Sequence, residues 1–265
     1  MTTMKGNNPE LSSGSISHTK KSVYLIRHAE SEENRRIAAF SRSFQSLRNF
    51  SLPKTSDVLT STELLNAPAQ VDSLVSSIGA NQISHMGEKL EKENFITNSG
   101  INLVLHSPLL RARQTSEGML GCVAASLSDD EKKVSIVSKV IQTDLLLEKT
   151  PSEWTPIYYS RFLKRIADFE AWLGEQPEET IAIVGHSQFF KTMLGLKLKF
   201  DNCEVWKVDF DAKQGNCSKE TIHGIADDVS KDDLSTGNRT LSLPSCWSNL
   251  EKVYACEIQS SPKTV

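Results

Sequence analysis

The chain has 265 residues, a formal net charge of −3 at pH 7 and a hydrophobic content of 38%. This length fits one large domain or two small ones. The slight acidity gives no general attraction to nucleic acid or to an anionic membrane, and no stretch approaches the roughly 20 apolar residues of a membrane-spanning helix.

The N-terminal segment is polar and has no apolar stretch typical of a secretory signal. It carries too few apolar groups to offset the entropy of ordering, so we predict a disordered leader over residues 1–20. Residues 21–265 are predicted to form a single domain. Residues at about 40–70 are rich in Ser, Leu and Thr and contain two prolines, so they are predicted as an insertion with one or two short helices. Residues 211–243 are polar and turn-rich and are predicted as a second insertion.

Short apolar runs followed by polar residues predict the strands, which lie at 23–26, 101–105, 134–141, 181–184, 205–210 and 253–258. Helical patterns lie between them, starting at residue 32, over 82–94, after Pro108, and over 161–173 and 188–196. Ser31, Ser107 and Ser187 stand where they can cap three of these helices. The alternation predicts an α/β three-layer sandwich, with a mostly parallel central sheet flanked by helices.

The five cysteines are odd in number, widely scattered and without a C-x-x-C pair. This pattern argues against a zinc site and against a disulfide framework. We therefore expect reduced thiols and a cytoplasmic protein.

Two of the predicted strands run directly into a histidine. Residues 23–26 precede Arg27 and His28, and residues 181–184 precede Gly185 and His186. In a parallel sheet both imidazoles reach the same edge, where open α/β sheets bind ligands. Because guanidinium groups hold phosphate oxygens well, the neighbouring arginine indicates phosphoryl chemistry.

His28 is the candidate nucleophile, since a neutral imidazole can attack phosphorus. Arg27 is placed to reach over the phosphate, and Arg111 lies where a helix N-terminus also favours an anion. His186 is a second donor to the transferring oxygens, and Asn34 is a candidate for a further hydrogen bond.

A proton donor for the leaving oxygen is expected in the stretch after residue 143. Glu148 is our choice because three leucines precede it, and apolar surroundings would raise the pKa of its carboxyl. Asp144 and Glu153 lie in the same stretch and remain alternatives.

Three motifs in this order resemble the histidine phosphatase superfamily, the phosphoglycerate mutase-like group. They are R-H-A-E-S at residues 27–31 with Asn34, S-P-L-L-R-A-R-Q-T at 107–115, and V-G-H-S at 184–187. Residues 72–82 and the pair Leu147-Glu148 are similar to two further family segments. The resemblance covers roughly residues 22–210, and it departs from the family pattern at Ala29, Ser187 and Gln188, where glycine is more usual.

The resemblance implies a phosphate monoester hydrolase that forms a phosphohistidine at His28, within a pocket of Arg27, Arg111 and His186. It implies no metal and no organic cofactor, and a small phosphorylated substrate, with a phosphoprotein left open. One alternative is a mutase that returns the phosphoryl group to its substrate. Residues 32–36 lack the tryptophan of the family's mutases, which favours hydrolysis. Another alternative is a non-catalytic phosphate-binding or scaffold protein, and the oligomeric state stays open.

Overall fold

A computed structural model describes residues 20–49, 51–62, 72–122, 137–149, 153, 156–214 and 243–260. All of the predicted leader except Lys20, and most of the predicted insertion at 211–243, lie outside these residues. The domain boundaries therefore stay predictions.

The centre of the described part is a six-stranded sheet with the order β3-β2-β4-β1-β5-β6. Its strands are β1 (Lys21–Arg27), β2 (Leu103–His106), β3 (Lys139–Gln142), β4 (Thr180–Gly185), β5 (Val205–Phe210) and β6 (Trp247–Tyr254). The first four pair in parallel, whereas β5 and β6 pair antiparallel. The predicted α/β class with a mostly parallel central sheet is confirmed.

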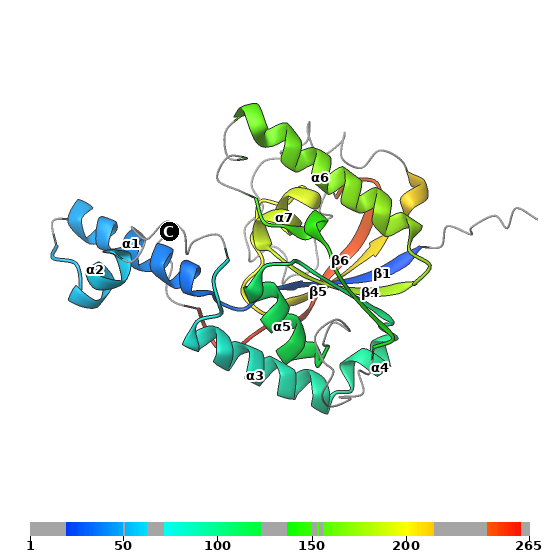
Figure 1. Cartoon of the computed structure of the whole chain (residues 1–265), viewed down its shortest axis with the longest axis horizontal. Helices are drawn as coiled ribbons and strands as arrows, with labels where there is room; N and C mark the ends of the chain where they lie inside the picture. Colours follow the sequence, from blue (N-terminus) through cyan, green and yellow to red (C-terminus); the bar gives the residue numbers. More distant parts are fainter. Residues whose placement is uncertain are drawn as a thin grey trace, which may run out of the picture.

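Helices cover both faces of the sheet (Figure 1). The helices are α1 (Glu32–Arg48), α2 (Thr55–Thr62), α3 (Ser77–Lys92), α4 (Phe95–Ser99), α5 (Leu110–Leu120), α6 (Pro156–Glu175) and α7 (Ser187–Met193), with short 3-10 turns η3 (Asp144–Leu146) and η5 (Ala212–Gln214). In Figure 1, α6 and α7 lie on one face and α3, α4 and α5 on the other, while α1 and α2 project beyond the sheet.

Alternate residues of the central strands pack into two separate hydrophobic cores. Val23 and Leu25 of β1 pack under α6 and α7, whereas Tyr24 and Ile26 pack toward α3 and α5. A strand buried on both faces has to be apolar throughout, which explains the continuous apolar runs in the sequence.

Two predicted strands differ from the observed ones. β6 ends at Tyr254, so the strand predicted over 253–258 is wrong for most of its length. Among the described strands β6 pairs only with β5, at the sheet edge. Most of its residues are partly or fully exposed, so it lacks an apolar run. β3 begins at Lys139, because Val137 and Ser138 lie in a bend before it.

Only one of the three predicted serine caps is confirmed. The Ser31 hydroxyl accepts the backbone N–H of Asn34 at 3.2 Å and caps α1. Ser107 does not cap α5, because that helix begins at Leu110, whose N–H bonds to Asp72 Oδ1 at 2.6 Å. The prediction of Ser187 as a cap is also wrong, because Ser187 is the first residue of α7 and His186 occupies the cap position.

The expectation of reduced thiols is also wrong at one position. Cys246 takes part in a disulfide, whereas Cys122, Cys203 and Cys256 are free. Among the helices that the structure describes, none combines the length and the apolar composition needed to span a membrane.

Candidate active site

The carboxyl ends of β1 and β4 bring two histidines together. The strands are neighbours in the sheet, and the His28 N–H continues their ladder by donating to Gly185 O at 2.9 Å. The ring centroids of His28 and His186 are 5.0 Å apart, with an interplanar angle of 61°. Both side chains are buried, so the predicted convergence of two imidazoles at one sheet edge is present.

One nitrogen of His28 is oriented toward the backbone. His28 Nδ1 lies 2.6 Å from the carbonyl oxygen of Ala29, which can only accept a hydrogen bond. Nδ1 therefore carries the proton, and Nε2 keeps its lone pair. Burial, and then the charges of His186, Arg111 and Arg27, lower the pKa of His28 well below its usual value. The imidazole is thus neutral at pH 7, as a nucleophile requires.

His186 is held between a hydroxyl and a carboxylate. Its Nε2 lies 2.9 Å from Ser107 Oγ, and its Nδ1 lies 3.4 Å from Glu148 Oε2. Burial lowers the pKa of His186 to about 3, although Glu148 acts in the opposite direction. Sequence reasoning missed the contact to Ser107, because a serine before a proline and a helix is typical of a cap.

Two buried guanidinium groups supply positive charge to the site. Arg111 is 3% exposed, and its Nη2 donates to Glu148 Oε2 at 2.5 Å. Arg27 is 6% exposed, and its Nη1 donates to the carbonyl of Phe200 at 2.7 Å. Arg27 Nε is buried without a hydrogen-bond partner in the described part of the chain. Such donors are well suited to a phosphate group.

Glu148 is the carboxylate that reaches the histidines and Arg111. Arg165 fixes the segment that carries it, by donating to the carbonyls of Leu147 and Glu148. The predicted rise in the pKa of Glu148 is wrong. Burial does favour its neutral form, but the electrostatic effects of His186, Arg111 and Arg27, with the hydrogen bond from Arg111, outweigh burial and lower the pKa. A leucine-rich lead-in does not reveal the cations that face the carboxyl from other elements.

The other predicted site residues are placed differently. The alternative acid Glu153 pairs with Arg165 at 2.9 Å. Asp144 begins the turn η3. Asn34 lies in the first turn of α1, and its buried Oδ1 has no hydrogen-bond partner among the residues described. Its predicted bond to a phosphate stays a prediction.

A second carboxylate, which sequence reasoning missed, also faces Arg111. Glu33 Oε2 lies 3.5 Å from Arg111 Nη1, and the two groups form an ion pair. Burial, and secondarily repulsion from Glu148, raises the pKa of Glu33, although Arg111 acts in the opposite direction. An acidic residue in the first turn of a helix is common because it complements the helix dipole, so its position carried no distinctive signal.

The ligand atoms of His28, Glu148 and His186 lie within 4.8 Å of one another, as in a possible metal site. Two imidazoles and one carboxylate are a donor set that zinc uses in proteins. Here, however, Arg111 already binds the carboxylate oxygen, and the charge of Arg27 acts on all three groups. The residues present therefore fit an anion better than a cation.

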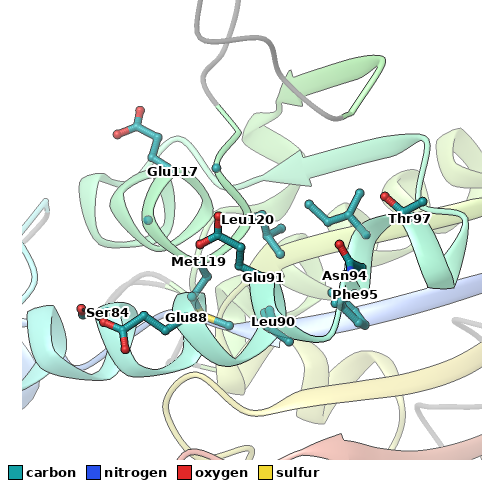
Figure 2. Close-up of a pocket in the computed structure, with 14 residues that line it drawn as sticks. Ser84, Glu88, Leu90, Glu91, Asn94, Phe95, Thr97, Glu117, Met119 and Leu120 are labelled. Atoms are coloured by element: carbon teal, nitrogen blue, oxygen red, sulfur yellow. Dashed lines mark hydrogen bonds between the residues drawn. The ribbon is translucent and has the colours of Figure 1, made fainter.

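A cavity of about 520 Å³ lies between α3, α4 and α5 (Figure 2). None of the residues that line it belongs to the histidine site. Gly87 and Gly118 let α3 and α5 approach closely beside the cavity, since a Cβ on Gly87 would lie 2.7 Å from the Gly118 carbonyl oxygen. Its charged lining consists of the carboxylates of Glu88, Glu91 and Glu117. Carboxylates repel a phosphate, so this cavity is not a second phosphate site.

No family model and no curated protein matches the chain. Solved structures do match it. A phosphoglycerate mutase from Bacillus anthracis is 15% identical, covers 74% of this chain and 90% of its own, and has a TM-score of 0.46. YhfR from Bacillus stearothermophilus is 14% identical, with coverages of 72% and 92% and a TM-score of 0.45.

A phosphoserine phosphatase from Entamoeba histolytica, solved with 3-phosphoglyceric acid, is also similar. It is 17% identical, with coverages of 74% and 93% and a TM-score of 0.42. At identities and TM-scores this low the likeness carries no argument about activity.

Proposed function

We propose that this protein is a phosphate monoester hydrolase of the histidine phosphatase superfamily, with His28 as its nucleophile. The observation that carries the proposal is the pair of buried imidazoles with ring centroids 5.0 Å apart, beside the buried guanidiniums of Arg27 and Arg111. A neutral nucleophile surrounded by cationic donors is what attack on a phosphate dianion needs.

In the first step, His28 Nε2 attacks phosphorus and forms a P–N bond, while the bond from phosphorus to the ester oxygen breaks. Arg27, Arg111 and His186 stabilise the charge on the equatorial oxygens. In the second step, water attacks phosphorus, the P–N bond breaks, and inorganic phosphate leaves. The intermediate between the two steps is a phosphohistidine.

Glu148 supplies the proton to the leaving oxygen in this proposal. Its contact with Arg111 and the lowered pKa support an ionised carboxyl before a substrate binds. A phosphate dianion competes for Arg111 and adds negative charge beside Glu148, which raises its pKa. Binding of the substrate thus loads the acid with a proton, and Glu148 then serves as the base for water.

The test measures phosphate release from p-nitrophenyl phosphate by the purified protein. We expect His28→Ala to reduce kcat/KM by at least about a thousandfold, because the residual catalysis of such a site comes from binding alone. His85→Gln on α3, outside the site, is the matched control and should retain activity. A base-stable, acid-labile phosphoenzyme should form with wild type and not with His28→Ala.

Full activity of His28→Ala would overturn the proposal. Product analysis separates the mutase alternative, because a mutase yields an isomeric ester in place of free phosphate. The substrate is proposed to be a small phosphorylated molecule. The cytoplasmic location stays a prediction, and the disulfide at Cys246 counts against it, since disulfides are rare in that compartment.

A further inference from the structure

Carboxylates form the solvent side of the histidine site. The side chains of His186 and Arg111 are 0% and 4% exposed, whereas those of Glu148 and Glu33 are 33% and 25% exposed. The phosphoryl group of a substrate has to lie against the buried imidazoles and guanidiniums. Its leaving group therefore points outward, toward the two carboxylates.

Glu33 depends on the same guanidinium that a phosphate would occupy. Its Oε2 is 3.5 Å from Arg111 Nη1, and that nitrogen has no hydrogen-bond partner in the described part of the chain. Arg36, on the same helix, also attracts Glu33. When a phosphate takes the donors of Arg111, Glu33 loses its closest counter-ion and faces a second anion.

Glu33 also differs from Glu148 in what it contacts. Glu148 is 3.4 Å from His186 Nδ1 and reaches the groups that would touch the reacting atoms. Glu33 contacts Arg111 from α1, and the charged groups acting on it are Arg111, Glu148 and Arg36. Its place on the outer side of Arg111 suits contact with the leaving group rather than with phosphorus.

We propose that Glu33 is a specificity-determining residue that selects phosphate monoesters whose leaving group carries a cation close to the ester oxygen. This inference rests on the function proposed above and assigns its substrate class. An ammonium on the leaving group replaces the counter-ion that Glu33 loses when phosphate binds to Arg111. A carboxylate on the leaving group adds a further repulsion, so anionic esters are poor substrates.

The test compares kcat/KM at pH 8 for three esters of similar size: 2-aminoethyl phosphate, ethyl phosphate and phosphoglycolate. At this pH the amine is protonated, as a lysine would be, and the carboxylate is ionised. We expect wild type to prefer the aminoethyl ester to phosphoglycolate. Glu33→Gln should reduce that ratio about tenfold, as expected for one lost charge-assisted contact.

Glu32→Gln is the matched control, because Glu32 precedes Glu33 on α1 but pairs with Arg35 at 2.7 Å. It should leave the ratio unchanged, and Glu33→Asp should retain part of the preference. If wild type and Glu33→Gln hydrolyse p-nitrophenyl phosphate and show the same ratio, the role of Glu33 is overturned while the hydrolase function stands. If wild type releases phosphate from none of the four compounds, both proposals fail.

Discussion

Three buried histidines end or follow strands of this sheet, yet only two of them form a pair. His106 ends β2, and its Nδ1 lies 2.9 Å from the Ser107 carbonyl oxygen, much as His28 Nδ1 contacts Ala29. The ring of His28 faces His186, and burial, together with His186 and the guanidiniums of Arg111 and Arg27, lowers the pKa of His28. A strand-end position alone therefore does not place a histidine in the candidate site. The opposing imidazole and the nearby guanidiniums distinguish His28.

The role of Glu148 predicts a dependence on the leaving group. Glu148→Gln removes the proposed proton donor but keeps the size of the side chain. We expect kcat/KM for an alkyl phosphate to fall by about a hundredfold or more, the range typical of general acid catalysis. The fall for p-nitrophenyl phosphate should be at most about tenfold, because nitrophenolate leaves without a proton. Steady-state kinetics on both esters checks this.

Glu153→Gln is the control for that experiment, since Glu153 pairs with Arg165 rather than with Arg111. It should affect both esters equally. A selective loss on the alkyl ester in Glu153→Gln, and none in Glu148→Gln, would show that our choice of the acid is wrong. Asp144→Asn is to be measured in the same way.

At the scale of elements, the N-terminus of α3 supports the loop that follows His28. The Ser76 hydroxyl donates to Glu30 Oε1 at 2.8 Å, and Gln82 Oε1 accepts from the Glu30 N–H at 2.9 Å. Gly79 lies between Ser76 and Gln82 in the sequence. A Cβ at residue 79 would lie 2.0 Å from the Glu30 carbonyl oxygen. The helix can approach the loop this closely only because residue 79 has no side chain.

Gly79→Ala should therefore destabilise the protein and disturb the site. The atom in the way belongs to the backbone, so relief requires a shift of α3 or of the loop after His28. We expect a loss of about 2 kcal/mol or more in the free energy of unfolding, together with reduced activity. Urea unfolding monitored by circular dichroism measures the loss.

Asn81→Ala on the exposed side of the same helix is the control, and it should change stability by less than about 0.5 kcal/mol. If Gly79→Ala and Asn81→Ala unfold at the same urea concentration, α3 does not depend on this close approach.

The sequence predicts those elements whose signal is local. Buried strands such as β1 and β4 need continuous apolar runs, and their final histidines follow directly along the chain. The edge strand β6 gives a weak signal, because β5 is the one described strand that neighbours it. The contacts of Ser107 and Glu33 depend on segments that are distant in the chain. For the same reason, the leucines before Glu148 gave the wrong sign for its pKa shift.

At the scale of the whole molecule, burial lowers the pKa of two histidines and raises the pKa of one carboxyl. The two kinds of shift have opposite effects on how stability depends on pH. His186 has a pKa of about 3 in the folded protein and about 6.5 when unfolded. The unfolded chain therefore binds more protons below pH 6.5, so stability falls as pH decreases. His28 acts in the same direction, since its pKa is also lowered.

Glu170 of α6 acts in the opposite direction. It is 5% exposed, it accepts a hydrogen bond from Trp247 Nε1 at 2.7 Å, and burial raises its pKa from 4.5 to about 7. The folded protein keeps this proton while the unfolded chain loses it above pH 4.5. Its contribution to stability is therefore present at low pH and is lost as pH rises to about 7.

Together these groups predict that stability is greatest near pH 6.5. The variant Glu170→Gln tests the contribution of Glu170. The amide stays neutral and can still accept the bond from Trp247. Glu170→Gln should leave stability at pH 4.5 nearly unchanged. It should increase stability at pH 8 by an amount on the order of 3 kcal/mol, because folding holds the pKa of Glu170 at about 7 instead of 4.5. Urea unfolding at a series of pH values measures this.

Glu175→Gln, at an exposed position of the same helix, is the control and should show no such change. Equal stabilities of wild type and Glu170→Gln at pH 8 would mean that Glu170 is ionised in the folded protein without cost.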